Sequence, residues 1–132
     1  MKDMTAALII KDRKMLLVHN MKHNGLRIEP PGGKRESNED LEKCVIREVK
    51  EELGIKIQPI KLFGVYETKS PEGDFKVYMY FSKIEEGIPT LIERDKISKF
   101  GWYSFEDMRR FEEQGYLVPN LCSALEALKK FL

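Results

Sequence analysis

The stretch from Gly33 to Ile55, GKRESNEDLEKCVIREVKEELGI, constrains this chain more than any other part of it. Ser37 and Asn38 are favourable residues for the N-cap of a helix, and negative charge follows them where the first turn favours it. Gly54 suits a helix that ends in the left-handed conformation. The sequence therefore predicts a helix over residues 39–53.

The predicted helix has an apolar face and an acidic face. At about 100° per residue, Val45, Val49 and Leu53 fall on one side. The opposite side carries Cys44, Arg47, Glu48, Glu51 and Glu52. Carboxylates at these spacings repel one another, so a cation should compensate them. A hard divalent ion such as Mg²⁺ takes such oxygen ligands, although a cluster of this kind alone is more often a solvated helix face.

The complete spacing separates these two interpretations. Five residues lie between Gly33 and Glu39, and seven more precede the run Arg47-Glu48-Val49-Lys50-Glu51-Glu52-Leu53-Gly54-Ile55. This matches the signature of the Nudix hydrolases, G-x5-E-x7-R-E-U-x-E-E-x-G-U with U aliphatic. At a usage of about 7% for each fixed letter, a chance match at one start point has a probability on the order of 10⁻⁸. The chain thus resembles that family.

Composition points to one globular domain over residues 1–132. The 23 basic and 22 acidic residues give a net charge of +1, and no basic arm or long apolar run is present. We therefore expect no nucleic acid duplex and no membrane as partner, and a cytoplasmic location. Neither the two cysteines nor His19 and His23 have the spacing of a zinc site.

The remaining pattern alternates between strand-like and helix-like segments. Strands are predicted at 4–10 and 14–19 as a hairpin, at 26–29, at 56–69 and 75–84 as a second hairpin, and at 100–103, with a turn over 30–33. Helices are predicted after a capping box at Ser104 and over 121–131. This order resembles the Nudix fold, an α/β (α+β) sandwich with a mixed sheet between helices.

The resemblance implies hydrolysis of a nucleoside diphosphate linked to another group, with Mg²⁺ or Mn²⁺ as cofactor. Negative oxygens shield a pyrophosphate from nucleophiles, so cations that neutralise charge and activate water are required. By resemblance, Glu51 and Glu52 are metal ligands, Glu48 is a ligand or the base, and Arg47 orients Glu48. The resemblance also places the carbonyl of Gly32 on the metal and Glu39 near the metal through water. Lys34 and Glu36 are expected beyond the direct metal ligands, with Lys34 as a candidate for binding the substrate.

A further carboxylate is expected from a loop beyond the signature. Glu93 lies where MutT-type relatives supply a ligand or base, while Glu85, Glu86 and Asp95 compete for this role. A loop carboxylate that is merely solvated is the alternative.

The substrate is less constrained. Pro119-Asn120 before the last helix resembles the MutT-type nucleoside triphosphate pyrophosphohydrolases, in which Asn120 would read a purine edge; an N-cap is its other interpretation. Tyr80 could stack on a base or fill the core. Pro30 stands where MutT-type enzymes carry an aromatic residue, which weakens the case for an oxidised purine.

Three alternatives stay open at this point. Pro71 resembles a marker of ADP-ribose pyrophosphatases, and a dinucleoside polyphosphate is a further candidate substrate. A nucleotide-binding module without turnover would be expected to lack some of these carboxylates. An exposed apolar patch could support a homodimer.

Overall fold

The computed structural model describes residues 1–22, 25–70 and 72–132. Two residues considered above, His23 and Pro71, lie outside the described residues. The strands are β1 (Lys2–Lys11), β2 (Lys14–Asn20), β3 (Arg27–Glu29), β4 (Gly32–Lys34), β5 (Lys56–Ser70), β6 (Gly73–Glu86) and β7 (Ile97–Tyr103). The helices are α1 (Leu41–Leu53), α2 (Phe105–Glu113) and α3 (Pro119–Leu128), followed by a 3-10 turn at Lys129–Phe131.

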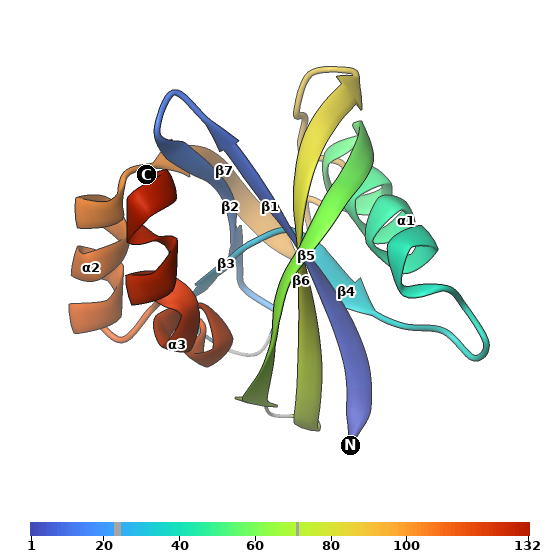
Figure 1. Ribbon diagram of the computed structural model, residues 1–132, viewed down its shortest axis with the longest axis horizontal. Helices are drawn as coiled ribbons and strands as arrows, with labels where there is room; N and C mark the ends of the chain where they lie inside the picture. Colours follow the sequence, from blue (N-terminus) through green and yellow to red (C-terminus); the bar gives the residue numbers. More distant parts are fainter. Residues whose placement is uncertain (23–24, 71) are drawn as a thin grey trace.

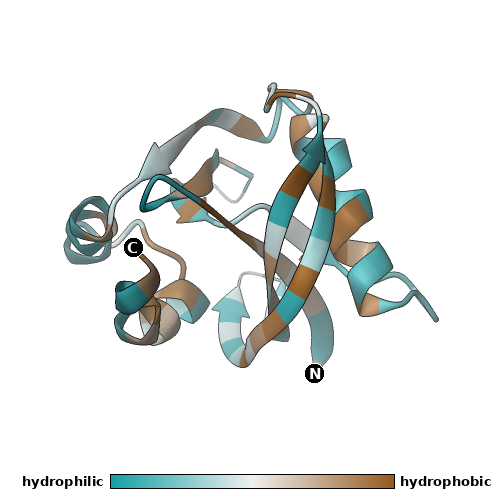
Figure 2. Ribbon diagram, turned by 45° about the horizontal axis from the view of Figure 1, so that its top comes forward, coloured by the Kyte–Doolittle hydropathy of each residue, from teal (hydrophilic) through white to brown (hydrophobic). Residues whose placement is uncertain are grey.

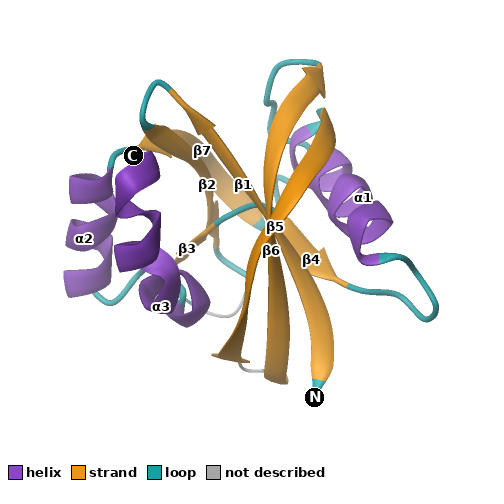
Figure 3. Ribbon diagram, viewed as in Figure 1, coloured by secondary structure: helices purple, strands orange, loops and turns teal. Residues whose placement is uncertain are grey.

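Helices cover both faces of the sheet. α1 lies on one side, whereas α2 and α3 lie together on the other (Figure 1). The strands form the layer between them (Figure 3). The predicted α/β (α+β) sandwich with a mixed sheet is confirmed.

Two cores form because the first strands are apolar in both directions. Ala6 and Leu8 belong to the core beneath α2 and α3, whereas Ala7 and Ile9 belong to the core beneath α1. Successive side chains of a strand point to opposite faces, so a continuous apolar run fills both layers. Along the β5–β6 ribbon, apolar and polar bands alternate instead (Figure 2).

β1 is the centre of the sheet. It pairs in parallel with β6, from Lys2 opposite Phe75 onward, and the strand order is β3-β2-β1-β6-β5. The predicted hairpin with β2 is confirmed at its turn, where Ile10 pairs with Met15. β1 pairs with β2 only at Ile10 and Lys11, and its earlier residues, Met4 to Ala6, pair with β4 instead.

The prediction of a turn over residues 30–33 is wrong for its last two residues. Gly32 and Gly33 lie in β4, opposite Ala6 and Thr5 of β1. A Cβ on Gly32 would stand 2.1 Å from the carbonyl oxygen of Thr5. Only glycine allows this approach, which brings β4 against the centre of the sheet.

α1 begins at Leu41, later than predicted. Asn38 has a φ of 62° and Asp40 is extended with a ψ of 140°, so neither has helical geometry. The N-cap is Asp40, without a side-chain hydrogen bond, and not Ser37 or Asn38. The predicted end is confirmed, because Gly54 has a φ of 69° and donates its N–H to the Lys50 carbonyl.

The last two helices differ in how well their starts were predicted. The capping box of α2 is confirmed, with Ser104 and Asp107 each accepting the other's backbone N–H. α3 starts at Pro119 with Val118 as N-cap, so the N-cap interpretation of Asn120 is wrong. Among the described residues, no helix has both the length and the apolar character needed to cross a membrane.

Candidate active site

A cleft of about 230 Å³ lies beside the second half of α1. Its lining includes Glu48, Glu51 and Glu52 of α1 and Glu93 of the β6–β7 loop. Cationic side chains also line it, namely Lys22, Arg27, Lys34 and Lys96. The fold therefore brings the predicted carboxylates together in a cleft that also holds positive charge.

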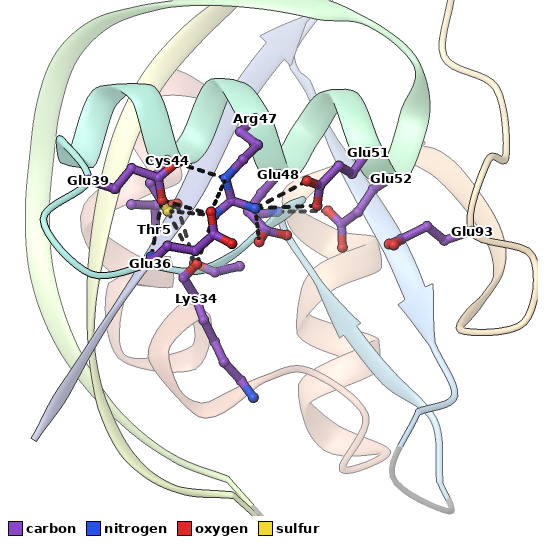
Figure 4. A network of polar contacts seen from close by, with 12 residues as sticks. Thr5, Lys34, Glu36, Glu39, Cys44, Arg47, Glu48, Glu51, Glu52 and Glu93 are labelled. Atoms are coloured by element: carbon purple, nitrogen blue, oxygen red, sulfur yellow. Dashed lines mark hydrogen bonds and ion pairs between the residues drawn. The ribbon is translucent and has the colours of Figure 1, made fainter.

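Arg47 connects the acidic residues of the signature (Figure 4). Its Nε and Nη2 donate to the two carboxylate oxygens of Glu39 at 2.7 and 2.9 Å. Its Nη1 donates to Glu48 at 2.8 Å and to Glu51 at 3.2 Å, and Nη2 reaches the Lys34 carbonyl at 3.1 Å. Such a planar fork fixes several acceptors at once. Hydrogen bonds from Arg47 lower the pKa of Glu39 to about 2.

Glu48 lies against the backbone of β4. A Cβ at Gly33 would stand 2.3 Å from Glu48 Oε2, so glycine makes room for this carboxylate. Burial raises the pKa of Glu48, and the neighbouring charges of Glu51 and Glu93 raise it further against the effect of Arg47. The carboxylate is therefore held where a negative charge is costly.

Glu52 is the most buried of these carboxylates. It is 6% exposed, and its Oε1 accepts the N–H of Gly32 at 2.9 Å. Burial raises its pKa well above the usual range, helped by the charges of Glu29, Glu48 and Glu93. The predicted acidic face is thus only partly solvated, since Glu52 and Cys44 on that face are both buried.

Glu93 is positioned by backbone hydrogen bonds between its loop and the end of α1. Thr90 N–H donates to the Leu53 carbonyl, and Ile92 N–H donates to the Glu52 carbonyl. These bonds lay the loop along the helix, and the Glu93 side chain extends toward Glu52 (Figure 4). Of the competing carboxylates named above, Glu85, Glu86 and Asp95 do not line the cleft.

The donor set fits a hard divalent cation in its chemistry, because all of its side-chain ligands would be carboxylate oxygens. Within the described ranges, no three His, Cys, Asp or Glu side chains are grouped closely enough to hold a metal ion as they stand. Arg47 engages Glu48 and Glu51, and the amide of Gly32 engages Glu52. Convergence on one ion therefore requires rotation of these side chains.

Other predicted residues divide between the cleft and the rest of the molecule. Lys34 lines the cleft and pairs with Glu72, and Asn120 lines it while 4% exposed. Tyr80 does not line the cleft; it is 8% exposed in the core beneath α1, so the structure gives it no access to a nucleotide there. Glu39 also lies outside the cleft lining, on the other side of Arg47.

Several residues that line the cleft were not predicted from the sequence, and Glu29 and Thr68 are two of them. Glu29 of β3 lines the cleft and accepts a hydrogen bond from Asn20 at 3.0 Å. Its position directly before the Pro30-Pro31 pair was the only signal available. Thr68 of β5 also lines the cleft, and nothing in its residue type distinguishes it from an ordinary strand residue.

The structure agrees with the fold that the signature predicts. A mixed sheet lies between helices, and glutamates of one helix line a cleft. The family model for the NUDIX domain matches residues 1–121, and the chain belongs to this family.

Relatives agree with this assignment. YtkD of Bacillus subtilis (strain 168), by its name a candidate 8-oxo-dGTP diphosphatase, is 38% identical over 64 residues, which are 48% of this chain and 40% of that protein. The 8-oxo-dGTP diphosphatase of Escherichia coli (strain K12) is 36% identical over 67 residues, 51% of this chain and 52% of that protein. The chain thus spans about half the length of these relatives or less.

A solved structure extends the similarity to the fold. The MutT NUDIX hydrolase from Burkholderia pseudomallei superposes with a TM-score of 0.75 and 27% identity. The superposition covers 80% of this chain and 84% of that one.

Proposed function

We propose that this protein hydrolyses a phosphoanhydride bond in a nucleoside diphosphate linked to another group. The preferred substrate is a (deoxy)nucleoside triphosphate, which would yield a nucleoside monophosphate and pyrophosphate. The observation that carries this proposal is that Glu48, Glu51, Glu52 and Glu93 line one cleft in a chain of the NUDIX domain family.

The carboxylates and one carbonyl supply the groups for Mg²⁺ or Mn²⁺. Glu51 and Glu52 would hold the ion, and the Gly32 carbonyl, Glu48 and Glu93 are the further candidates. When bound, such an ion neutralises charge on the phosphates and lowers the pKa of an attacking water. The raised pKa values of Glu48 and Glu52 support this role, because a cation would favour their charged forms.

The protein's own groups do the remaining work. Glu48 or Glu93 accepts the proton of the attacking water, and Arg47 holds Glu48 in place through its 2.8 Å hydrogen bond. Lys34, which lines the cleft, binds a phosphate of the substrate. Asn120, which is buried in the first turn of α3 and lines the cleft, is the candidate contact to the base.

The relatives' names support the triphosphate, since both refer to 8-oxo-dGTP. ADP-ribose or another ADP-sugar is the alternative, with AMP and ribose 5-phosphate as products, and a dinucleoside polyphosphate follows. A non-catalytic nucleotide-binding module is disfavoured because every carboxylate of the signature is present.

Location and assembly complete the proposal. We place the protein in the cytoplasm, with no duplex or membrane as partner. Ile60, Leu62 and Val65 are exposed on β5, which ends the strand order of the sheet, and they support a homodimer formed through this edge.

One assay tests the activity. The protein is incubated with Mg²⁺ or Mn²⁺ and a panel of dNTPs, 8-oxo-dGTP, ADP-ribose and diadenosine polyphosphates, and the products are separated by chromatography. We expect a monophosphate and pyrophosphate in equal amounts from a triphosphate. Binding without product under every metal would instead support the non-catalytic module.

A further inference from the structure

Each lysine or arginine that lines the cleft, among the residues that the structure describes, is paired with a glutamate that lines it too. These ion pairs join Arg27 with Glu29, Lys96 with Glu93, and both Lys22 and Lys34 with Glu72. Within this set, Glu72 holds two cations. The mechanism proposed above gives this carboxylate no role, although it lies in a cleft that would receive a polyanion.

The two lysines approach Glu72 from different parts of the chain. Lys22 follows β2, Lys34 ends β4, and Glu72 lies in the turn between β5 and β6. Lys22 Nζ lies 3.4 Å from Glu72 Oε1, whereas Lys34 Nζ contacts Oε2. Each lysine thus holds a different oxygen of one anionic group. Two oxygens of a phosphate can be held by two ammonium groups in the same manner.

The turn that carries Glu72 has its own hydrogen bonds. Ser70 pairs with Gly73 at the end of the β5–β6 hairpin. The Ser70 hydroxyl accepts the N–H of Glu72 at 3.1 Å and donates to the carbonyl of Gly73 at 3.0 Å. Ser70 also lines the cleft. The backbone therefore presents the Glu72 carboxylate to the two lysines.

Lys34 has further contacts that do not depend on Glu72. Its Nζ lies 6.0 Å from the centroid of the Phe75 ring, and its backbone carbonyl accepts a hydrogen bond from Arg47 at 3.1 Å. Its side chain extends away from the glutamates of α1 (Figure 4). The ammonium group of Lys34 is therefore positioned for an anion in a part of the cleft that those glutamates leave open.

The ion pairs of Glu72 are exposed to solvent. The side chains of Lys22, Lys34 and Glu72 are 38%, 45% and 31% exposed. Such pairs contribute little to stability because water and salt screen them. A hydrogen bond from Lys34 lowers the pKa of Glu72, so the carboxylate is charged at neutral pH. A ligand that carries more negative charge can therefore take its place.

We propose that Glu72 is an internal competitor for the phosphates of the substrate. In the free protein its carboxylate occupies Lys22 and Lys34, and the polyphosphate of the substrate displaces it. This inference rests on the proposed function, to which it adds Lys22 as a second phosphate-binding residue and Glu72 as a restraint on binding. Two or more linked phosphates displace Glu72 more readily than a monophosphate does, because they carry more charge.

Inorganic pyrophosphate with Mg²⁺ is the probe, because it has the charge of linked phosphates and no base. Isothermal titration calorimetry compares the wild type with Glu72→Gln, which keeps the size of the side chain and removes its charge. E72Q should bind pyrophosphate about fivefold more tightly, which is the range of an exposed ion pair. The matched control is Glu85→Gln, since Glu85 pairs with Lys56 at 3.7 Å but does not line the cleft. E85Q should bind pyrophosphate as the wild type does.

A second comparison distinguishes displacement from a general effect of charge. With Lys22→Gln as the background, Glu72 competes for one lysine only, so the gain from E72Q should fall to about twofold. An undiminished gain in this background would mean that Glu72 merely repels anions across the cleft, and it would overturn the inference.

The outcomes also separate this inference from the proposed function, because the binding of pyrophosphate requires no turnover. Equal affinities of the wild type and E72Q, or no measurable binding by either protein, would overturn the inference even if the wild type hydrolyses triphosphates. If the wild type hydrolyses no nucleotide, tighter binding of pyrophosphate to E72Q still supports the competition. With turnover, the KM of E72Q for a triphosphate should fall by a similar factor.

Discussion

The carboxylate of Glu48 lies directly against Cα of Gly33, so that a Cβ at residue 33 would stand 2.3 Å from Oε2 and 2.4 Å from Cδ. The two residues come from different elements, β4 and α1, and pairing of β4 with β1 fixes their approach. The absence of a side chain at residue 33 therefore determines where this carboxylate can stand.

Gly33→Ala should displace Glu48 and lower kcat. A misplacement of about 1 Å can cost about 10²-fold in rate, so we expect a loss of this order while circular dichroism reports the same fold. The control is Gly115→Ala, since Gly115 has a φ of 81° but no atom within 4 Å of a Cβ. G115A should lose stability and keep its kcat. A G33A enzyme with the wild-type kcat would show that the position of Glu48 does not matter.

Glu52→Gln should lower kcat by orders of magnitude without unfolding the protein. Glutamine keeps an oxygen that can accept the Gly32 N–H but loses the charge that a cation needs. Glu42→Gln, in the first turn of the same helix and outside the cleft, is the matched control and should retain activity. Unchanged turnover in E52Q would refute the assigned role.

The same substitution should change how metal-free stability depends on pH. Burial raises the pKa of Glu52 above 4.5, so the folded state binds its proton more tightly than the unfolded state does. The contribution of protonated Glu52 to the free energy of unfolding is then fully present below pH 4.5, and it is lost as pH rises through the folded pKa. In EDTA at neutral pH, E52Q should therefore be more stable than the wild type by urea unfolding. Identical pH profiles would contradict the burial argument.

Glu39 should act in the opposite direction. Arg47 lowers its pKa from 4.5 to about 2, so its contribution is present above pH 4.5 and is lost as pH falls toward 2. Glu39→Gln should flatten the acid limb of the stability curve. A lysine at residue 47 cannot donate to Glu39, Glu48 and the Lys34 carbonyl at the same time. Arg47→Lys should therefore lower the free energy of unfolding by about 2 kcal/mol. A wild-type acid limb in E39Q would mean that this ion pair contributes nothing.

Local signals in the sequence were sufficient for several elements. Gly54 ends α1 because its left-handed conformation costs glycine little, and Ser104 with Asp107 starts α2 because each satisfies the other's backbone. Such features depend on residues within a few positions of one another. For the same reason the spacing of the signature could place three glutamates on one helix.

Features that depend on distant contacts could not be predicted. The parallel pairing of β1 with β6 joins residues more than 70 positions apart, and the glycine pair became a strand only because β1 lies beside it. The side chain of Tyr80 points to the opposite face of β6 from those of its two neighbours, and it is buried only because α1 covers that face. The Thr68 hydroxyl, which has no hydrogen-bond partner among the described residues, has no sequence signal at all.

The central claim is that the carboxylates of the cleft hold a divalent cation, and binding of Mn²⁺ tests it most directly because the measurement does not depend on the choice of substrate. Electron paramagnetic resonance detects the binding as a loss of the free-ion signal. The wild type should bind the ion, and the double variant Glu51→Gln/Glu52→Gln should bind it at least about tenfold more weakly. A wild type that takes up no Mn²⁺, or a double variant with the same affinity, would contradict the account.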